Sequence, residues 1–188
     1  MPSPDLLNSA LLVLRVFLGF LLVAHGVLKF LQGGGLDAET ALLTKDGLRG
    51  GRLAAAISAL TQIGAGTLLA AGLLTPLAGA GAIGAMVVAV CTKAHNGFWV
   101  PDDGLEFPLI FAVLSVVATL AGPGQWSLDH VAGLSSTTTE TLGAVGLGLI
   151  AGAATFPVLR QPHSQATTTN SRLAATDPGA APTEEKLS

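Results

Sequence analysis

Five apolar runs alternate with short polar segments along the chain. They cover residues 10–31, 53–74, 77–94, 105–120 and 142–159. An α-helix of about 20 apolar residues is long enough to cross the hydrocarbon core of a bilayer. The pattern therefore predicts an all-α integral membrane protein. We expect the first four runs to form an antiparallel four-helix transmembrane bundle, and the fifth run to add another transmembrane helix.

Turn signals fall at the ends of these runs. They are the glycines at 33–35, Thr75-Pro76 and the Gly-Pro-Gly at 122–124, all residues that interrupt a helix. The last 28 positions are rich in Thr, Ala, Pro and Ser, a composition that cannot bury enough apolar surface to fold. We therefore expect a short N-terminal segment at 1–9, the four-helix membrane domain at 10–130, the additional helix within 131–160 and a disordered tail at 161–188.

Composition supports the membrane class. Half of the residues are hydrophobic and 11% are charged, against roughly a quarter charged in soluble domains. The net charge of -3 is small and scattered, so we expect no nucleic-acid partner. The single cysteine, Cys91, excludes an intrachain disulfide and disfavours dithiol chemistry.

Ionisable and polar side chains gather at one end of the predicted bundle. Antiparallel threading brings the end of the first run, the early half of the second, the end of the third and the start of the fourth to the same membrane side. Ionisable groups inside a membrane protein mark candidate functional sites. The candidate cluster there comprises His25, Lys29, Gln62, His95, Trp99 and Glu106. Arg15 and Asp129 fall at the opposite end, where we expect a structural ion pair.

The chemistry of the cluster has several interpretations. His25 and His95 are suited to hydrogen-bonding a quinone carbonyl; haem ligation is less favoured, and the spacing does not indicate a metal site. Alternatively, each histidine is a buried polar residue satisfied within the protein. Glu106 is a proton carrier, a counter-ion for Lys29 or Lys93, or a carboxylate favoured by the helix dipole. We expect Asp102 and Asp103 to be solvated loop residues.

Several motifs resemble the DoxX family of small four-span bacterial membrane proteins. LLVLRVFLGFLLVAHGVLKF resembles its first helix, QIGAGTLLAAGLLTPLAG its second helix and the following turn, and AHNGFW, LEFPL and GPGQWSLD its later part. The resemblance covers about residues 10–130. It departs where Gln62 replaces the family's usual glutamate and where the fifth run and the tail extend the chain. The family is similar to quinone-linked oxidoreductase subunits, and some members are associated with redox and oxidative-stress complexes.

These observations lead to one principal functional expectation and two alternatives. The first is a membrane subunit or accessory of a redox complex, with a quinone-like or other small molecule bound in one half of the bundle. The second is a non-catalytic assembly subunit, in which the Gly148-x-x-x-Gly152 pair of the last run docks a partner. The third is a small-solute transporter. We expect a bacterial inner-membrane location, contact with the bilayer, and a protein partner or a second copy within it.

Two arguments give opposite orientations. Lys45, Arg49, Arg52 and Lys93 share one membrane side, which the positive-inside rule places in the cytoplasm. The family resemblance implies the reverse, with the amino terminus inside and the histidine side outward. We expect the family orientation, because basic residues at a functional site distort the charge count.

Overall fold

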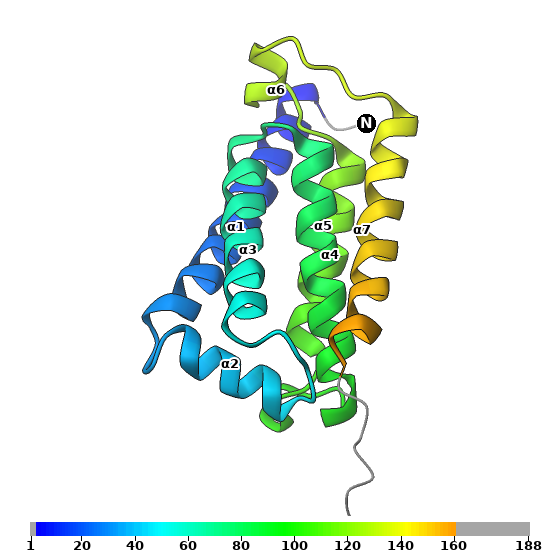
Figure 1. Cartoon of the computed structure of the whole chain (residues 1–188). Coiled ribbons are helices and arrows are strands. Elements are labelled where there is room, and N and C mark those ends of the chain that lie inside the picture. Colours follow the sequence, from blue (N-terminus) through cyan, green and yellow to red (C-terminus); the bar gives the residue numbers. More distant parts are fainter. Residues whose placement is uncertain (1–2, 161–188) are drawn as a thin grey trace, which may run out of the picture.

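Five long helices lie side by side in the structure, a computed structural model that describes residues 3–160 (Figure 1). They are α1 (Pro4–Leu31), α3 (Gly51–Ala71), α4 (Thr75–Lys93), α5 (Glu106–Ala121) and α7 (Thr138–Leu159). The shorter helices are α2 (Leu36–Lys45), the 3-10 helices η1 (Ala94–Asn96) and η2 (Val100–Asp102), and α6 (Leu128–Val131). Residues 3–160 form no strand beyond an isolated bridge between Leu48 and Arg160. The predicted all-α fold is confirmed.

Four helices are long and apolar enough to cross a membrane. They are Pro4–Leu31, Gly51–Ala71, Thr75–Asn96 and Thr138–Leu159. The fourth predicted run forms α5, which is apolar but has 16 residues. At 1.5 Å per residue it is about 24 Å long, less than the roughly 30 Å of a hydrocarbon core. The fifth run is therefore long enough to span the membrane, whereas the fourth run forms a helix, α5, that is shorter than the hydrocarbon core.

Two helices begin earlier than their apolar runs because of capping. α1 begins at Pro4, since Ser3 Oγ accepts the backbone N–H of Leu6 at 3.3 Å. Most of the segment predicted at 1–9 is therefore helical. α7 begins at Thr138, since Thr137 and Glu140 form a capping box with bonds of 2.7 and 3.2 Å. Hydropathy alone misses such polar first turns.

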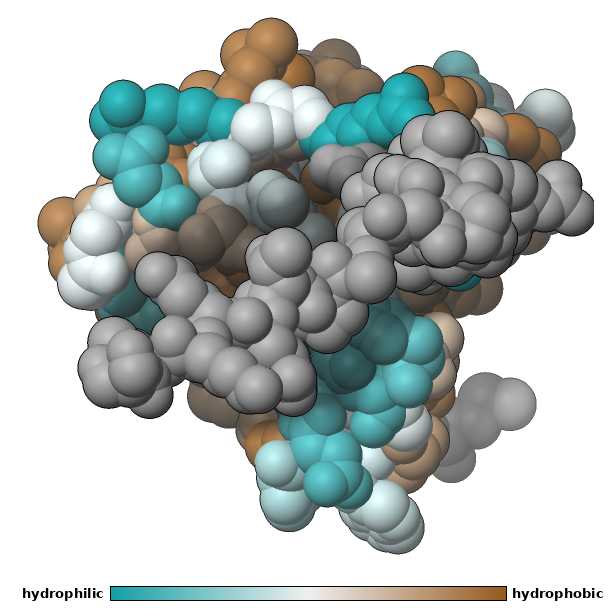
Figure 2. Space-filling model, turned by 60° about the horizontal axis from the view of Figure 1, so that its bottom comes forward, coloured by the Kyte–Doolittle hydropathy of each residue, from teal (hydrophilic) through white to brown (hydrophobic). Residues whose placement is uncertain are grey.

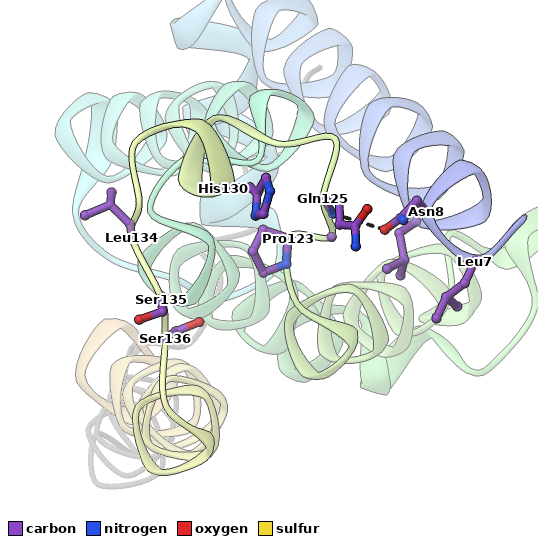
Figure 3. Close-up of a pocket in the computed structure, with 10 residues that line it drawn as sticks. Leu7, Asn8, Pro123, Gln125, His130, Leu134, Ser135 and Ser136 are labelled. Carbon is purple, nitrogen blue, oxygen red and sulfur yellow. Dashed lines mark hydrogen bonds between the residues drawn. The ribbon is translucent and has the colours of Figure 1, made fainter. Parts of the chain in front are cut away.

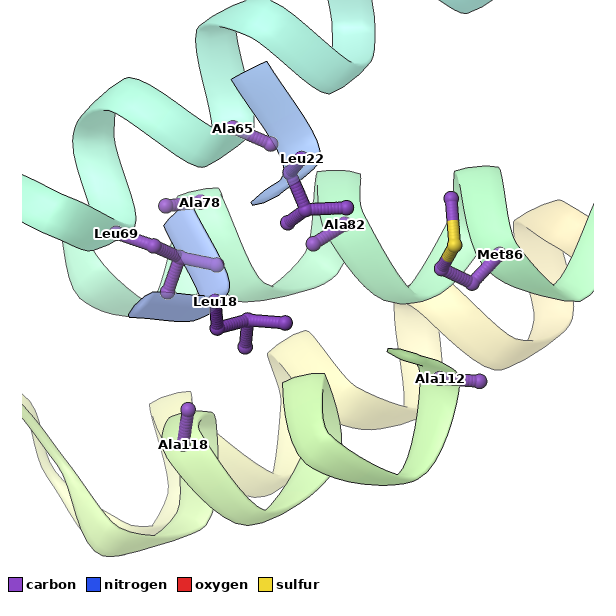
Figure 4. Close-up of a cluster of buried hydrophobic side chains, with 9 residues drawn as sticks. All are labelled: Leu18, Leu22, Ala65, Leu69, Ala78, Ala82, Met86, Ala112 and Ala118. Carbon is purple, nitrogen blue, oxygen red and sulfur yellow. The ribbon is translucent and has the colours of Figure 1, made fainter. Parts of the chain in front are cut away.

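The helices α1, α3, α4 and α5 form a closed four-helix bundle around small side chains. α1 packs on α3, α3 on α4, α4 on α5, and α5 returns to α1. A Cβ on Gly66 of α3 would lie 2.7 Å from Gly19 O of α1, so glycine is required where these helices cross. Figure 4 shows the apolar core, which consists of Leu18, Leu22, Ala65, Leu69, Ala78, Ala82, Met86, Ala112 and Ala118.

The fifth long helix, α7, packs on the outside of α4. Its buried residues are Gly148 and Gly152. A Cβ on Gly148 would lie 2.8 Å from Ala80 O, and one on Gly152 would lie 2.7 Å from Gly84 O. The prediction that this glycine pair docks a separate partner is therefore wrong, because α4 of the same chain already occupies it.

Residues 33–52, predicted as a connection, contain the helix α2. It lies across one end of the bundle (Figure 1) and packs on α3. Asp37 and Glu39 lie in its first turn and Lys45 in its last, as the helix dipole favours. The tail predicted to be disordered, 161–188, lies outside the described residues.

Candidate functional site

The predicted site lies at the bundle end crossed by α2, which we call the α2 end. The end of α1, the start of α3, the end of α4 and the start of α5 meet there. Figure 2 shows hydrophilic side chains gathered on this face, with hydrophobic residues around them. The polar groups of the site therefore lie where the apolar helices end.

Lys29 joins three helices at the α2 end. From α1, its Nζ lies 2.6 Å from Oε1 of Glu39 on α2 and 3.1 Å from Oγ of Ser58 on α3. The two charged side chains are only 13% and 17% exposed. A lysine buried this far requires a paired acceptor, and Glu39 provides one, so Glu106 is not the counter-ion of Lys29.

Lys93 makes the second ionic link of the α2 end. Its Nζ lies 3.0 Å from Oδ2 of Asp46, directly after α2, and 2.6 Å from Oδ2 of Asp103 in the loop after α4. The Asp46 side chain is 6% exposed. Asp103 is thus both an ion-pair partner of Lys93 and, with its side chain 62% exposed, the solvated loop residue that was expected. The helix α2 is held near both ends by lysines of other helices.

The segment between α4 and α5 is a compact loop closed by its own backbone. Leu105 N–H bonds to Gly97 O at 3.1 Å and Glu106 N–H to Phe98 O at 3.0 Å. The Glu106 carboxylate accepts the Val100 N–H at 3.3 Å, so it caps the loop. The loop presents Trp99, 63% exposed, with its ring edge-to-face against Phe98 at 5.1 Å.

The two histidines are both exposed. His25 lies on the outer side of α1 and His95 in η1. Neither makes a hydrogen bond or ion pair within residues 3–160. Gln62, by contrast, is 2% exposed in α3, and its Oε1 has no hydrogen-bond partner in the described part of the chain.

The six predicted residues therefore divide into separate environments. Within residues 3–160 no hydrogen bond or ion pair joins any two of them. Nor do any three His, Cys, Asp or Glu side chains of that range come together as metal ligands. The structure places an exposed His95–Trp99 loop, a buried Lys29 ion pair and a buried Gln62 in the same half of the molecule.

The opposite end of the bundle holds Arg15 and Asp129, both almost fully buried. Arg15 Nη2 donates to Trp126 O at 2.7 Å. Oδ1 of Asp129 accepts Leu74 N–H at 2.7 Å, and its Oδ2 accepts both the N–H and the hydroxyl of Thr75, at 2.9 and 2.7 Å. No direct ion pair joins the two groups within the described residues, although the charge of Asp129 acts on Arg15. Each group is hydrogen-bonded by the connections that close this end.

The first part of the chain matches a known family. Residues 10–96 match DoxX. The chain therefore contains a DoxX domain. The match extends from α1 through η1 and ends before the loop that carries Trp99 and Glu106, so it is shorter than the resemblance at 10–130. No curated protein and no solved structure matches the chain.

The DoxX domain contains both lysines that hold α2, as well as His25, Gln62 and His95. The DoxX match and the four long apolar helices together show that the chain is an integral membrane protein. The domain also contains Glu39 and Asp46, which were not among the predicted site residues. Their signal was a short segment after three glycines, with acids at its start and a lysine at its end.

Proposed function

We propose that this DoxX protein is a membrane subunit or accessory of a redox complex and binds a quinone-like molecule at the α2 end. The observation that carries the proposal is the loop after α4. It holds an exposed aromatic pair, Phe98 and Trp99, four residues or fewer from the unpaired imidazole of His95. An aromatic face and a hydrogen-bonding group at the membrane surface suit a ring that bears carbonyl oxygens.

The proposed roles follow from the chemistry of these groups. The Trp99 ring stacks on the quinone ring, and His95 donates a hydrogen bond to a carbonyl oxygen. An imidazole both donates and accepts protons, so His95 is also suited to pass a proton to the reduced quinone. Cys91 is the chain's only cysteine. A single cysteine cannot form the dithiol pair that would supply two electrons. Another subunit therefore supplies the electrons, and this one binds the quinone.

Tryptophan fluorescence tests the site directly, since the chain has two tryptophans and no tyrosine. Trp126→Phe leaves Trp99 as the reporter of the α2 end; Trp99→Phe leaves Trp126, 49% exposed, as the reporter of the opposite end. A soluble quinone analogue is titrated into each variant in nanodiscs. Collisions with the analogue in the lipid quench both rings weakly and in proportion to its concentration. We expect Trp126 to show only this linear quenching, and Trp99 to show additional quenching that saturates as the site fills.

Two histidine variants, one at each end of the bundle, provide a matched comparison. In the Trp126→Phe background, His95→Ala is expected to raise the quenching midpoint about tenfold, the effect of one lost hydrogen bond of about 1.4 kcal/mol. His130→Ala, an exposed histidine at the opposite end, should leave the midpoint unchanged. Equal, non-saturating quenching of both tryptophans would show that the α2 end has no quinone site.

A further inference from the structure

A cavity of about 400 Å³ lies at the bundle end opposite α2 (Figure 3). It is open to the outside and is lined by the first turns of α1, the loop at 123–125, α6 and the segment at 134–136. Leu7 and Leu11 of α1 provide apolar side chains on one side and Leu134 provides one on the other, and the side chains of Gln125, His130 and Ser136 provide polar groups. This volume falls within the range of small-molecule sites, about 300–1,000 Å³.

Asn8 supplies a fixed hydrogen-bond donor in this cavity. It is 7% exposed, and its Oδ1 accepts the backbone N–H of Gln125 at 3.0 Å. That bond determines which end of the carboxamide is oxygen, because only oxygen can accept an N–H. The Nδ2 group has no partner within residues 3–160. A ligand in the cavity therefore needs an acceptor atom opposite Nδ2.

The lining of the cavity does not favour a tightly bound phosphate, since His130 is its only side chain that can carry a positive charge. No lysine or arginine lines it. Arg15, the basic residue on the same half of α1, is buried and donates to Trp126 O instead. Phosphate recognition in proteins relies on such cations or on a run of free backbone N–H groups. An uncharged carbonyl oxygen is the acceptor that suits a lone amide donor.

We propose that this cavity binds a glycerophospholipid of the surrounding bilayer through an ester carbonyl. Asn8 lies four residues into α1, about 6 Å from its start. The headgroup region of one leaflet is about 5–8 Å thick, so a helix that starts at the membrane surface brings Asn8 to the level of the glycerol esters. Leu7 and Leu11, on the same helix as Asn8, then contact the first part of an acyl chain.

An ester lipid and its ether analogue differ only in the carbonyl oxygens, so comparing their binding measures the contribution of the carbonyl alone. The purified full-length chain is titrated, by native mass spectrometry, with diacyl phosphatidylcholine and with the dialkyl ether analogue of the same headgroup and chain length. We expect a one-to-one adduct that is about tenfold tighter for the ester lipid. Asn8→Asp keeps the acceptor for Gln125 N–H but removes the donor, so it should abolish the ester preference.

The control makes the same chemical change elsewhere. Asn96→Asp, at the α2 end, should retain the tenfold preference. Equal binding of ester and ether lipids by the unaltered chain overturns the proposal without any variant, as does an Asn8→Asp chain that still prefers the ester. If a quinone displaces the ester lipid and quenches Trp126 in the Trp99→Phe chain, the cavity is a quinone site and the lipid assignment is wrong.

Discussion

Arg15 shows how a charge is held inside a membrane helix bundle. Its guanidinium lies beside Gly72, which ends α3, and donates to Trp126 O. Asp129, bound to Leu74 and Thr75, also donates its backbone N–H to Gly72 O at 2.8 Å. An uncompensated buried charge costs several kcal/mol. Arg15, Asp129 and the backbone groups that they bind around Gly72 thus form a hydrogen-bonded cluster, which we call the polar closure of this end of the bundle.

Replacing Gly72 by alanine tests that closure. Gly72 has φ +63°, and a Cβ there would overlap Arg15 Nη1 and lie 2.7 Å from Ser127 Cβ. The left-handed backbone alone costs an alanine about 1–2 kcal/mol. Displacing Arg15 from its acceptor should add about 1–3 kcal/mol. We expect Gly72→Ala to lower the free energy of unfolding, measured in mixed micelles, by the sum of both effects.

Gly133→Ala is the matched control for Gly72→Ala. Gly133 has a similar φ, +66°, but a Cβ there would meet no atom within 4 Å. It should therefore show the backbone cost alone. If the two variants lose equal stability, the contact with Arg15 contributes nothing and the polar closure does not stabilise the bundle.

Among the elements, α2 is a helix that depends on its surroundings. It has ten residues and buries none of them, and isolated helices of this length are marginal in water. The ion pairs of Lys29 with Glu39 and of Lys93 with Asp46 hold it from α1 and α4. The helix is therefore positioned by tertiary contacts at its two ends.

The contact between α4 and α7 depends on glycine rather than on large apolar side chains. Gly152→Ala would place a Cβ 2.7 Å from both Gly84 O and Val87 Cβ. Overpacking of this kind typically costs about 1–3 kcal/mol, so we expect a lower thermal midpoint by circular dichroism. Gly146→Ala adds the same methyl group to open space; it should be neutral or slightly stabilising, since alanine favours helix by up to about 1 kcal/mol. Equal midpoints would contradict a close α4–α7 contact.

Over the molecule as a whole, basic side chains are distributed unevenly between the two ends. The exposed ones in the described part of the chain, Lys45, Arg49, Arg52 and Arg160, all lie at the α2 end. Arg15, at the other end, is buried. None of these four exposed residues takes part in the proposed quinone site, which removes the reason to discount them. The positive-inside rule then places the α2 end in the cytoplasm, the reverse of the orientation expected from the family.

Cysteine labelling tests this orientation. In a Cys91→Ala background, Thr44→Cys marks the α2 end and Thr139→Cys marks the start of α7; both threonines are exposed. A membrane-impermeant maleimide should label Thr139→Cys in intact cells and Thr44→Cys only after permeabilisation. The opposite pattern would restore the orientation implied by the family resemblance.

The membrane class, the five long helices and the DoxX domain all follow from the order of amino acids, because the length of an apolar run and its flanking turn residues are local properties of the chain. The same order places His25, Lys29, Gln62, His95 and Glu106 in one half of the bundle, because antiparallel threading depends only on the succession of the helices. The DoxX match and the four long apolar helices agree with the predicted membrane class and helices.

Which polar groups meet depends instead on how the helices pack. The rotation of each helix about its axis is not fixed by hydropathy, so the sequence did not show that Lys29 pairs with Glu39, or that Arg15 and Asp129 bind the backbone instead of each other. The helix α2 and the bond between Asn8 and Gln125, 117 residues apart, likewise depend on contacts between distant segments. The pairing of polar groups in this bundle is a property of its packing, whereas the helices themselves are a property of the chain.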